Sequence, residues 1–193
     1  MANVDKAFGL RPYKGLNVGS AVQEANKYNI DPSGYGTSIF QGDLCIFAGG
    51  YINRAAAGSA NLVGVFSHCY YVATDGTPTF KNYYPASTTA LGSGAIEAYI
   101  YDDPNQLFVV QADGSSGQAA IGQNADTDGI GGSTTTGVST RELDSSSINT
   151  TQALQLKIVS VVQDDINGDL TADNANLVVL INEHAYRGPV AGT

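Results

Sequence analysis

The sequence predicts an all-β fold: an antiparallel sandwich or barrel of jelly-roll-like type, with an extended N-terminal arm, long loops and little helix. Short runs rich in β-branched and aromatic residues recur between turn signals along most of the chain. No stretch keeps the apolar period of about 3.6 residues that a helical protein needs. Sandwich and barrel both remain open. The expected strands are Asp43–Phe47, Asn61–Phe66, Cys69–Val72, Ala95–Tyr101, Gln106–Gln111, Leu154–Val162 and Leu177–Ile181.

The first 24 residues are expected to form an extended arm, and residues 25–193 a single β domain. Glycines at positions 9, 15 and 19 and the Arg11-Pro12 step favour extended backbone. The apolar side chains of Phe8, Leu10, Tyr13 and Leu16 are poorly placed in water. Two interpretations remain open: a tether that docks on a neighbouring chain or on its own body, and a frayed terminus.

Two of the expected strands indicate which faces are buried. Alternation in the run Leu154–Ile158 places its three aliphatic residues on one face and its two polar residues, Gln155 and Lys157, on the other. The aliphatic face is expected in the core, and the polar face in solvent or against a partner. The run Leu177–Ile181 is apolar on both faces, as in a strand at the middle of the structure or one covered by another subunit.

Two stretches are expected to lie outside the core. Gln163–Asn176 has a density of Asp, Asn and Gly that is typical of a long hairpin loop. Asp113–Gly137 consists almost entirely of small and polar residues, too poor in large apolar side chains to fill a core. It is expected to form a surface loop or an inserted flap, and its sequence admits a short helix over Gly117–Gln123.

The chain carries few charges for its length. Only 14% of its residues are charged, against roughly 25% in an ordinary soluble domain. Because charged side chains are costly to desolvate at a protein contact, their scarcity favours an oligomer or a part of an assembly. The formal net charge is −9 and the nine Lys and Arg residues are spread singly. Nucleic acid and anionic membrane are therefore not expected as partners.

Membrane insertion and secretion are not expected either. Polar residues interrupt every apolar run well short of the roughly 20 residues that a membrane helix needs. Met1–Leu10 has no hydrophobic core of the signal-peptide kind. The expected place of synthesis is the cytoplasm.

The histidines and cysteines show no spacing that builds a metal or catalytic site. His68 and His184 belong to no zinc-ligand motif. Cys45 and Cys69 lie inside apolar runs, where a buried reduced thiol is expected and a disulfide is the alternative. His68 and Cys69 are neighbours in an expected strand, so their side chains point to opposite faces and are not expected to form a nucleophile and base pair.

One Asx-rich turn resembles half of a calcium-binding loop. Asn124, Asp126 and Asp128 supply oxygen atoms at alternate positions and Gly129 follows, but Thr135 stands where a bidentate Glu belongs. An ordinary turn is the expected structure, and no bound ion is predicted.

Paired carboxylates are the remaining route to catalysis. Glu97 with Asp102 or Asp103 is the candidate for a glycosidase pair, which needs two acids about 5–10 Å apart. Tyr99 and Tyr101 share the face of Glu97, and 11 tyrosines without any tryptophan favour packed interface surface over a sugar platform. The protein is predicted not to be an enzyme, with no catalytic residue, cofactor or metal ion.

Several segments, in order along the chain, share a pattern with one group of proteins. The segments are Ala7-Phe8-Gly9-Leu10-Arg11-Pro12, Ala98–Pro104 with Leu107-Phe108, Glu142–Ser146 leading to Ala153–Leu156, and the closing Leu177–His184. They resemble small tailed-phage virion structural proteins of the capsid decoration, or cement, type. The resemblance covers most of the chain, although residues 114–137 match little of it, and its motifs are not catalytic.

The resemblance implies a structural virion protein that decorates and stabilises the outer surface of a capsid by binding the lattice of the major capsid protein. It also implies self-association as a homotrimer, and a place on the outer capsid surface after synthesis in the host cytoplasm. The alternative is another virion component, such as a head fibre, tail or host-adhesion module, and an enzyme or free binding protein comes third. The arm is the expected capsid contact, through Phe8, Leu10, Arg11, Tyr13 and Leu16.

Overall fold

In the computed structural model, which describes residues 3–16 and 24–187, the protein is built almost entirely from β-strands. All pairings between named strands are antiparallel. Over these ranges helix occurs only as three single turns of 3-10 type, at Leu91–Ser93, Gln118–Ala120 and Ser145–Ser147. The predicted all-β antiparallel class with little helix is confirmed.

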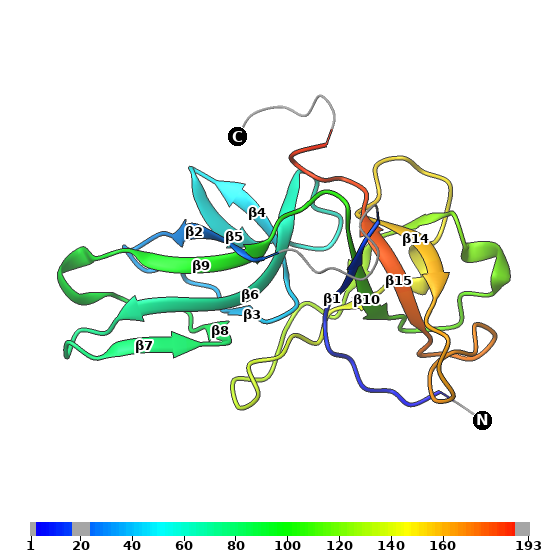
Figure 1. The fold of residues 1–193 in the computed structure, drawn as a ribbon, viewed down its shortest axis with the longest axis horizontal. Coiled ribbons are helices and arrows are strands. Elements are labelled where there is room, and N and C mark those ends of the chain that lie inside the picture. The colour runs from blue at the N-terminus through cyan, green and yellow to red at the C-terminus, as the bar shows by residue number, and fades with distance from the viewer. Residues whose placement is uncertain (1–2, 17–23, 188–193) are drawn as a thin grey trace.

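One large sheet, called sheet 1 below, has the strand order β1-β10-β15-β14-β11. Figure 1 shows its main strands grouped in the right half of the molecule. The central strand β15 is apolar at almost every position, as expected for a strand with neighbours on both sides. The bounds are β1 Arg11–Gly15, β10 Gln106–Gln111, β15 Asn176–Ile181, β14 Leu156–Val161 and β11 Asn124–Ala125.

The other large sheet, sheet 2, has the order β2-β9-β6-β4-β5, and β7 pairs with the far end of β6. It occupies the left half of the view in Figure 1. The two large sheets share no strand, so the arrangement is an open sandwich and not a closed barrel. The bounds are β2 Asn26–Ile30, β9 Ile96–Tyr101, β6 Leu62–Val72, β4 Leu44–Ala48, β5 Tyr51–Arg54 and β7 Pro78–Lys81. Two short pairs are β3 Ile39–Phe40 with β8 Tyr83–Tyr84, and β12 Thr127–Asp128 with β13 Glu142–Leu143.

The core consists of two main clusters that meet at β6. In the first cluster, side chains of both sheets pack together, and β6 contributes Leu62 and Val65. In the second, on the other side of sheet 2, β6 contributes Val63 and Phe66. The first half of β6 therefore has no solvent-facing side, which explains its unbroken apolar sequence.

The two runs expected on either side of Ser67 form the single strand β6. The pairing of β6 with β9 shifts between Phe66 and His68, and this bulge absorbs the interruption without ending the strand. Gly64 lies so close to β9 that an added Cβ would collide with the carbonyl group of Tyr101. A glycine in the middle of this strand is thus required by the close approach of two backbones.

Strand β15 buries both of its faces within the chain itself. Leu177 and Val179 belong to the first core cluster. Val178 and Leu180 lie on the opposite face, where they form a small third cluster with Leu107 of β10. Of the two options for this run, the strand at the middle of the structure is the one observed.

The face assignment for the run Leu154–Ile158 is right for Leu156 and Ile158 but wrong for Gln155, which is only 1% exposed. The Gln155 Oε1 atom accepts hydrogen bonds from the N–H and the hydroxyl of Thr127, and its Nε2 donates to two carbonyl groups of the loop after β5. Alternation does not distinguish a polar side chain in solvent from one whose hydrogen bonds are satisfied inside.

Residues 113–137 were expected outside the core, and this is wrong for part of the stretch. Ala120, Ala125 and Thr127 are buried, because small side chains fit where the edge strand β11 lies against β14. Of the short helix that the sequence admits over Gly117–Gln123, only the single 3-10 turn Gln118–Ala120 forms. The residues after β12 do form a projecting loop, seen at the lower centre of Figure 1.

The described part of the arm, residues 3–16, lies against the chain's own body. Strand β1 pairs with β10 at the edge of sheet 1, and Leu10 is buried in the first core cluster. For this part, docking on the chain's own body is the interpretation observed; residues 17–23 lie outside the described residues. The strand pairing itself was not predictable, because it joins main-chain groups and needs no apolar pattern.

Candidate functional site

The N-terminal segment, defined as residues 3–16, is fixed at its start to the loop that joins β14 and β15. Asn3 Nδ2 donates to the carbonyl oxygens of Asp169 and Asp173, at 2.9 and 2.8 Å. Asn167 Nδ2 donates to the carbonyl oxygen of Val4 at 2.8 Å. The loop is the hairpin expected from the Asx-rich sequence, and it serves as the anchor of the chain's beginning.

Two further contacts fix the middle of the N-terminal segment. The Lys6 N–H donates to Gln111 Oε1 at 2.8 Å, and the Leu10 N–H donates to the carbonyl oxygen of Gly42 at 2.9 Å. Gly42 has a φ of +93°, and an added Cβ would lie 3.0 Å from the Leu10 nitrogen, so only glycine fits there. The backbone of the segment is thus held in place, and its outward side chains have a fixed arrangement.

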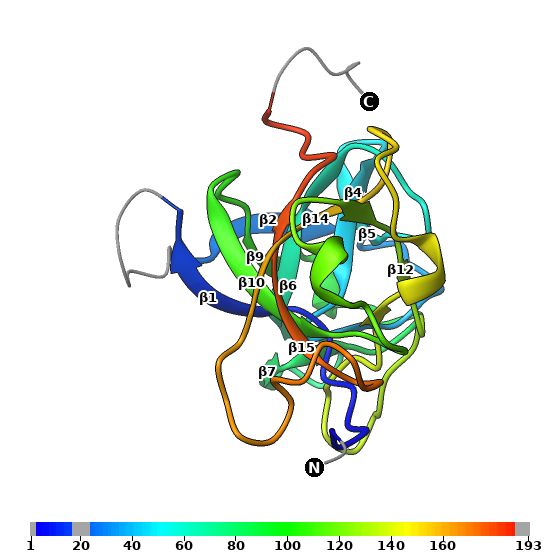
Figure 2. The same cartoon turned by 90° about the vertical axis from the view of Figure 1, so that its right-hand side faces the viewer.

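Strand β1 is an edge strand whose free side is protected against pairing with a strand of another chain. Its pairing with β10 shifts between Pro12 and Lys14, which leaves Tyr13 as the extra residue of a bulge. Pro12 has no N–H to offer, and the charge of Lys14 discourages pairing with another strand. Figure 2 shows β1 at the periphery of the molecule. A partner therefore meets the side chains of this strand before its main chain.

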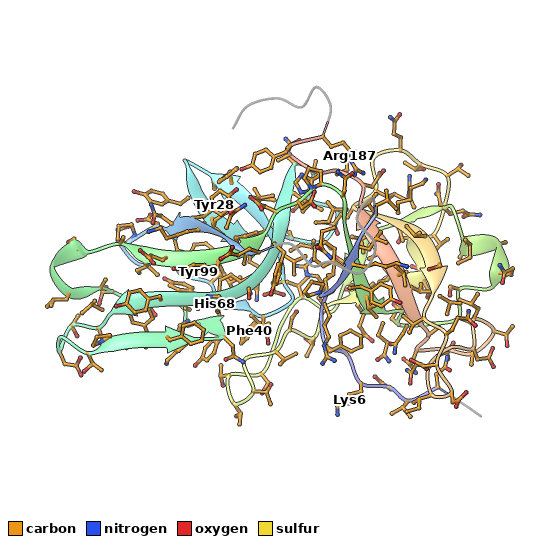
Figure 3. The ribbon with its side chains drawn as sticks, viewed as in Figure 1. Lys6, Tyr28, Phe40, His68, Tyr99 and Arg187 are labelled. Carbon is orange, nitrogen blue, oxygen red and sulfur yellow. The ribbon has the colours of Figure 1, made fainter. Side chains whose placement is uncertain are left out.

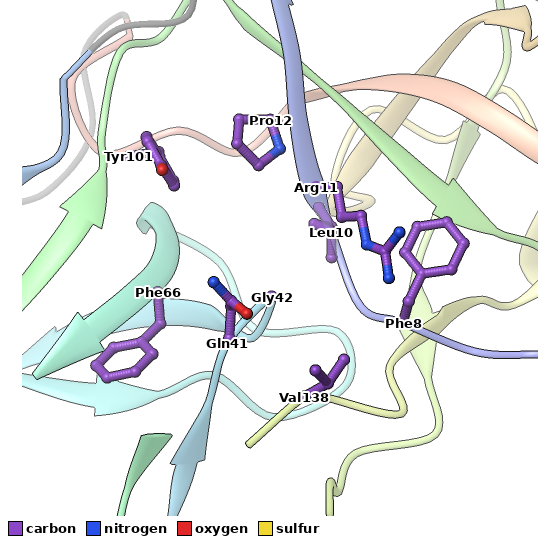
Figure 4. A pocket seen from close by; sticks show the side chains of 9 residues that line it. All are labelled: Phe8, Leu10, Arg11, Pro12, Gln41, Gly42, Phe66, Tyr101 and Val138. Carbon is purple, nitrogen blue, oxygen red and sulfur yellow. The ribbon is translucent and has the colours of Figure 1, made fainter. Parts of the chain in front are cut away.

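Two cavities flank the side chains of Phe8 and Arg11, which line both. The junction cavity, of about 280 Å³, lies between the start of β1 and sheet 2, where Phe66 and Tyr101 contribute to its wall; Figure 4 shows its lining. The loop cavity, of about 390 Å³, lies between the N-terminal segment and the loop joining β14 and β15. The guanidinium carbon of Arg11 is 4.2 Å from the Phe8 ring centroid, so this pair forms the wall between the cavities. The loop cavity is also lined by Val4, Lys6, Gln111, Ile166, Asn167 and Asn176.

The five arm residues selected from the sequence have different environments. Leu10 is buried in the core and is not available to a partner. Phe8 is half-buried and Arg11 is exposed, and the fold brings these two together. Tyr13 and Leu16 are 45% and 49% exposed on the edge strand.

Sequence reasoning missed Lys6 and Ile166, which line the loop cavity. Lys6 belongs to no motif, and its role comes only from the contact between distant segments; Figure 3 places it on the outer side of the N-terminal segment. Ile166 is 63% exposed. A single Ile within an Asp-rich loop was the only available signal, since such loops rarely carry large aliphatic side chains.

The N-terminal segment is positively charged on an acidic protein. Residues 1–16 contain three cationic residues and one acidic residue, whereas the whole chain has a formal net charge of −9. Two ion pairs occur in the part of the chain that the structure describes, and neither includes Lys6 or Arg11. The cations that the sequence spreads singly are thus brought together at one cavity, without carboxylate partners.

A row of rings crosses the outer face of sheet 2. His68 of β6 lies between Phe80 of β7 and Tyr99 of β9, with ring centroids 4.6 and 4.4 Å away. The Tyr99 hydroxyl donates to Glu97 Oε2 at 3.0 Å, and Glu97 Oε1 pairs with Lys27 Nζ at 3.0 Å. Figure 3 labels His68 and Tyr99 on neighbouring strands.

The rings of this row cover one another's faces. His68 and Tyr99 are stacked with an interplanar angle of 14°, and burial lowers the pKa of His68 below its ordinary value. Only Phe80, at the end of the row, is largely exposed, at 65%. Rings stacked in this way show their edges to solvent, so the row is a cross-strand ladder that stabilises the sheet.

A buried polar network joins sheet 2 to the short pair of β12 and β13. Asp43 Oδ1 accepts a hydrogen bond from the Ser139 hydroxyl at 2.6 Å and lies 3.7 Å from Arg141 Nε. Arg141 donates from Nη1 to the Thr127 hydroxyl at 2.6 Å and from Nη2 to the Ala55 carbonyl at 2.5 Å. Burial raises the pKa of Asp43 and lowers that of Arg141, and their mutual attraction opposes both shifts. None of these side chains lines either cavity, so the network holds the fold together.

The candidate catalytic carboxylates do not converge. Glu97 lies on the outer face of β9, whereas Asp102 follows that strand and accepts hydrogen bonds from Asn26 Nδ2 and the Tyr28 hydroxyl, at 2.8 and 2.5 Å. Burial, and then the bond to Asp102, raise the pKa of Tyr28, which keeps the phenol as the donor. Five residues of extended chain span roughly 16 Å, beyond the separation of a glycosidase pair. Asp103 accepts a backbone N–H within its own turn.

The cysteines and the Asx-rich turn have structural environments. Cys45 and Cys69 are free and fully buried, as expected, and burial raises the pKa of the Cys69 thiol to about 12. Asp126 and Asp128 each accept a backbone N–H with a carboxylate oxygen. Across residues 3–16 and 24–187 no group of three or more His, Cys, Asp and Glu side chains is placed to hold a metal ion.

Comparison with protein-family models, with curated proteins and with solved structures gives no match for this chain. Within the described ranges, no helix has the length and hydrophobicity that crossing a bilayer requires. The functional assignment therefore depends on the sequence and on the geometry of the N-terminal segment.

Proposed function

We propose that the protein is a structural virion component that decorates and stabilises the outer surface of a tailed-phage capsid by binding the lattice of the major capsid protein, as a homotrimer. The observation that carries the proposal is the N-terminal segment. Its backbone is anchored to the body, while the side chains of Arg11, Tyr13 and Leu16 stay exposed. A surface ordered in advance loses little conformational entropy when a partner binds.

The N-terminal segment and its anchoring loop carry more than half of the exposed large apolar side chains. Of the seven such side chains in the described residues, Val4, Tyr13 and Leu16 belong to the N-terminal segment and Ile166 to the loop that anchors it. An excess of exposed apolar residues on one segment is typical of a contact surface, whereas single exposed apolar residues are ordinary. The low charge content of the chain points in the same direction, because few charges need to be desolvated.

The first test is cryo-electron microscopy of purified phage particles that contain the protein. A decoration protein gives a regular array over the outer shell, with residues 3–16 against the capsid lattice. Density confined to one vertex or to the tail would overturn the decoration role and leave the alternative, a head fibre, tail or host-adhesion module.

A binding test uses particles that lack the protein, mixed with purified chain and then sedimented. Deletion of the whole arm is unsuitable, because Leu10 and β1 belong to the fold. The double variant Tyr13→Ser/Leu16→Ser is expected to lose coating and keep its melting temperature. The control is Tyr186→Ser/Leu91→Ser, which removes the same residue types at matched exposures of 51% and 50% elsewhere on the molecule. Equal coating by both variants would count against the N-terminal segment as the contact.

The host-adhesion alternative finds its best support in the aromatic row of sheet 2. A sugar stacks on an exposed ring, and Phe80, at 65%, is the most exposed ring of this row. Glycan-array binding that is lost in Phe80→Ala would favour adhesion over decoration.

A further inference from the structure

The loop cavity combines a positive side with an apolar side. Lys6 and Arg11 supply two cations, and Phe8, Val4 and Ile166 supply apolar surface. Its volume of about 390 Å³ lies within the range of about 300–1,000 Å³ that is typical of ligand pockets. The cavity thus suits a ligand that carries a negative charge next to an apolar group.

One carboxylate of the anchoring loop, two residues before Ile166, is already engaged within the loop. Asp164 Oδ1 accepts the N–H groups of Ile166 and Asn167, at 3.0 and 2.5 Å, and so closes the turn of the loop. Neither Lys6 nor Arg11 takes part in an ion pair among the residues described. The acceptors that these two cations need are therefore not carboxylates of the described chain.

The walls of the cavity are held rigidly. Gln111 donates to the Val4 carbonyl at 3.0 Å and accepts from the Lys6 N–H, and Asn167 donates to the carbonyls of Val4 and Asn174. These amides fasten the N-terminal segment to sheet 1 and to the anchoring loop. Binding at the cavity thus needs no rearrangement of its backbone, which favours affinity.

We infer that the loop cavity binds an acidic peptide segment of a partner protein, with a carboxylate side chain between Lys6 and Arg11 and a neighbouring aliphatic side chain against Phe8 and Ile166. The inference rests on the proposed function only in naming the source of the peptide, the capsid lattice protein. The recognition itself follows from the charge and shape of the cavity.

Charge complementarity selects this occupant. Nucleic acid and anionic membranes present many negative charges, which the formal net charge of −9 repels at long range. A single carboxylate is repelled far less, and two cations attract it at short range, where Arg binds it with directed hydrogen bonds. A free inorganic anion leaves the apolar wall in water, whereas a peptide with an aliphatic residue beside the acid covers it.

The test is a titration of the full ¹⁵N-labelled chain, followed by NMR, with the peptide acetyl-Leu-Asp-Leu-Glu-amide at low ionic strength. Its neutral counterpart, acetyl-Leu-Asn-Leu-Gln-amide, is the matched probe. We expect saturable shifts of the amide signals of Lys6, Phe8, Arg11, Asn167 and Asn176 with the acidic peptide only. Equal shifts with both peptides, equal shifts with sodium acetate alone, or no shifts would overturn the inference.

Charge-reversal variants test whether binding of the acidic peptide depends on the two cations of the loop cavity. Lys6→Glu/Arg11→Glu is expected to weaken the association of the acidic peptide about tenfold or more. Lys14→Glu, in the same segment but outside the lining of the cavity, is expected to change it less than about threefold, because exposed charges beyond contact distance are screened. A loss of equal size in both variants would show a general charge effect and overturn the site.

The two proposals fail separately. If the acidic peptide binds as expected but purified chain does not coat particles, the capsid role is wrong and the peptide site stands. If particles are coated equally by the chain and by Lys6→Glu/Arg11→Glu, and the peptide causes no shifts, the capsid role stands and the peptide site is wrong.

Discussion

Two arginines of this protein show how the same residue type serves the fold in one region and a partner in another. Arg141 is fully buried, and its acceptors, the Thr127 hydroxyl and the Ala55 carbonyl, come from the chain itself. Arg11 is exposed beside the Phe8 ring and has no carboxylate partner in the described residues. Where the chain supplies the acceptors, the arginine fixes the fold; where it does not, the acceptor has to come from outside.

The comparison predicts its largest effect for an acid placed inside the first core cluster. Leu156→Asp puts an unpaired charge at a position with no exposure, and we expect the free energy of unfolding to fall by about 5 kcal/mol or more. Leu16→Asp makes the same change on the N-terminal segment and is expected to stay within about 0.5 kcal/mol. Urea unfolding followed by circular dichroism measures both. A similar midpoint for both variants would show that Leu156 does not face the core.

The second prediction removes each arginine in turn. Arg141→Leu leaves Asp43 buried without its counter-charge, and the free energy of unfolding is expected to fall by about 3–5 kcal/mol. Arg11→Leu is expected to change it by less than about 0.5 kcal/mol and to weaken binding of the acidic peptide. The same urea experiment measures the unfolding free energies of both variants, and the peptide titration measures binding by Arg11→Leu. An unfolding free energy that is unchanged in Arg141→Leu would remove the distinction between the two regions.

The strands of the interior were predictable, and those of the surface were not. The runs that became β10 and β15 are apolar and β-branched, and the observed strands begin and end within a residue of the expected bounds. The edge strands β1, β2 and β7 carry Pro, Lys and Asn residues, and their sequences read as loops. Edge strands are held by main-chain pairing on one side, so they need no apolar pattern.

The candidate site was predictable only in part, because it is made by contacts between distant segments. Apolar residues in a polar context led to Phe8 and Tyr13. Lys6 and Ile166 meet at one cavity although 160 residues separate them. Gln155 was expected on an outward polar face for the same reason, since the two carbonyl groups to which its Nε2 donates lie 96 or more residues away in the sequence.

The third prediction concerns pH and the end of the described chain. His184 is buried against β6, with Nδ1 accepting the Tyr186 N–H at 3.1 Å. Burial, and then the charge of Arg187, lower the pKa of His184 to about 4, while Asp102 and Asp103 act in the opposite direction. Between this pKa and the unfolded value of about 6.5 the unfolded chain binds more protons than the folded chain, so stability falls as the pH drops through that window.

Protonation of His184 is expected to lower the free energy of unfolding by up to about 3 kcal/mol by pH 4. Urea midpoints at pH 7 and pH 4.5 measure it, with His184→Asn as the control, because Asn keeps an acceptor and does not titrate. The parent chain should lose more stability between the two pH values than the variant. Equal losses would assign the pH dependence to carboxylates instead of His184.

The smallest effect on stability is predicted for Phe80→Ala. This variant tests whether the aromatic row only supports sheet 2 or also contacts a partner. The ring is 65% exposed and contacts His68 at 4.6 Å, so its loss is expected to cost less than about 1 kcal/mol of unfolding free energy. Because the row is a ladder within sheet 2, coating of phage particles should be unchanged, in contrast to Tyr13→Ser/Leu16→Ser. Unfolding and sedimentation are measured on the same preparation. Loss of coating at unchanged stability would move the contact surface from the N-terminal segment to the aromatic row, since a ladder ring that only supports its sheet has no effect on binding.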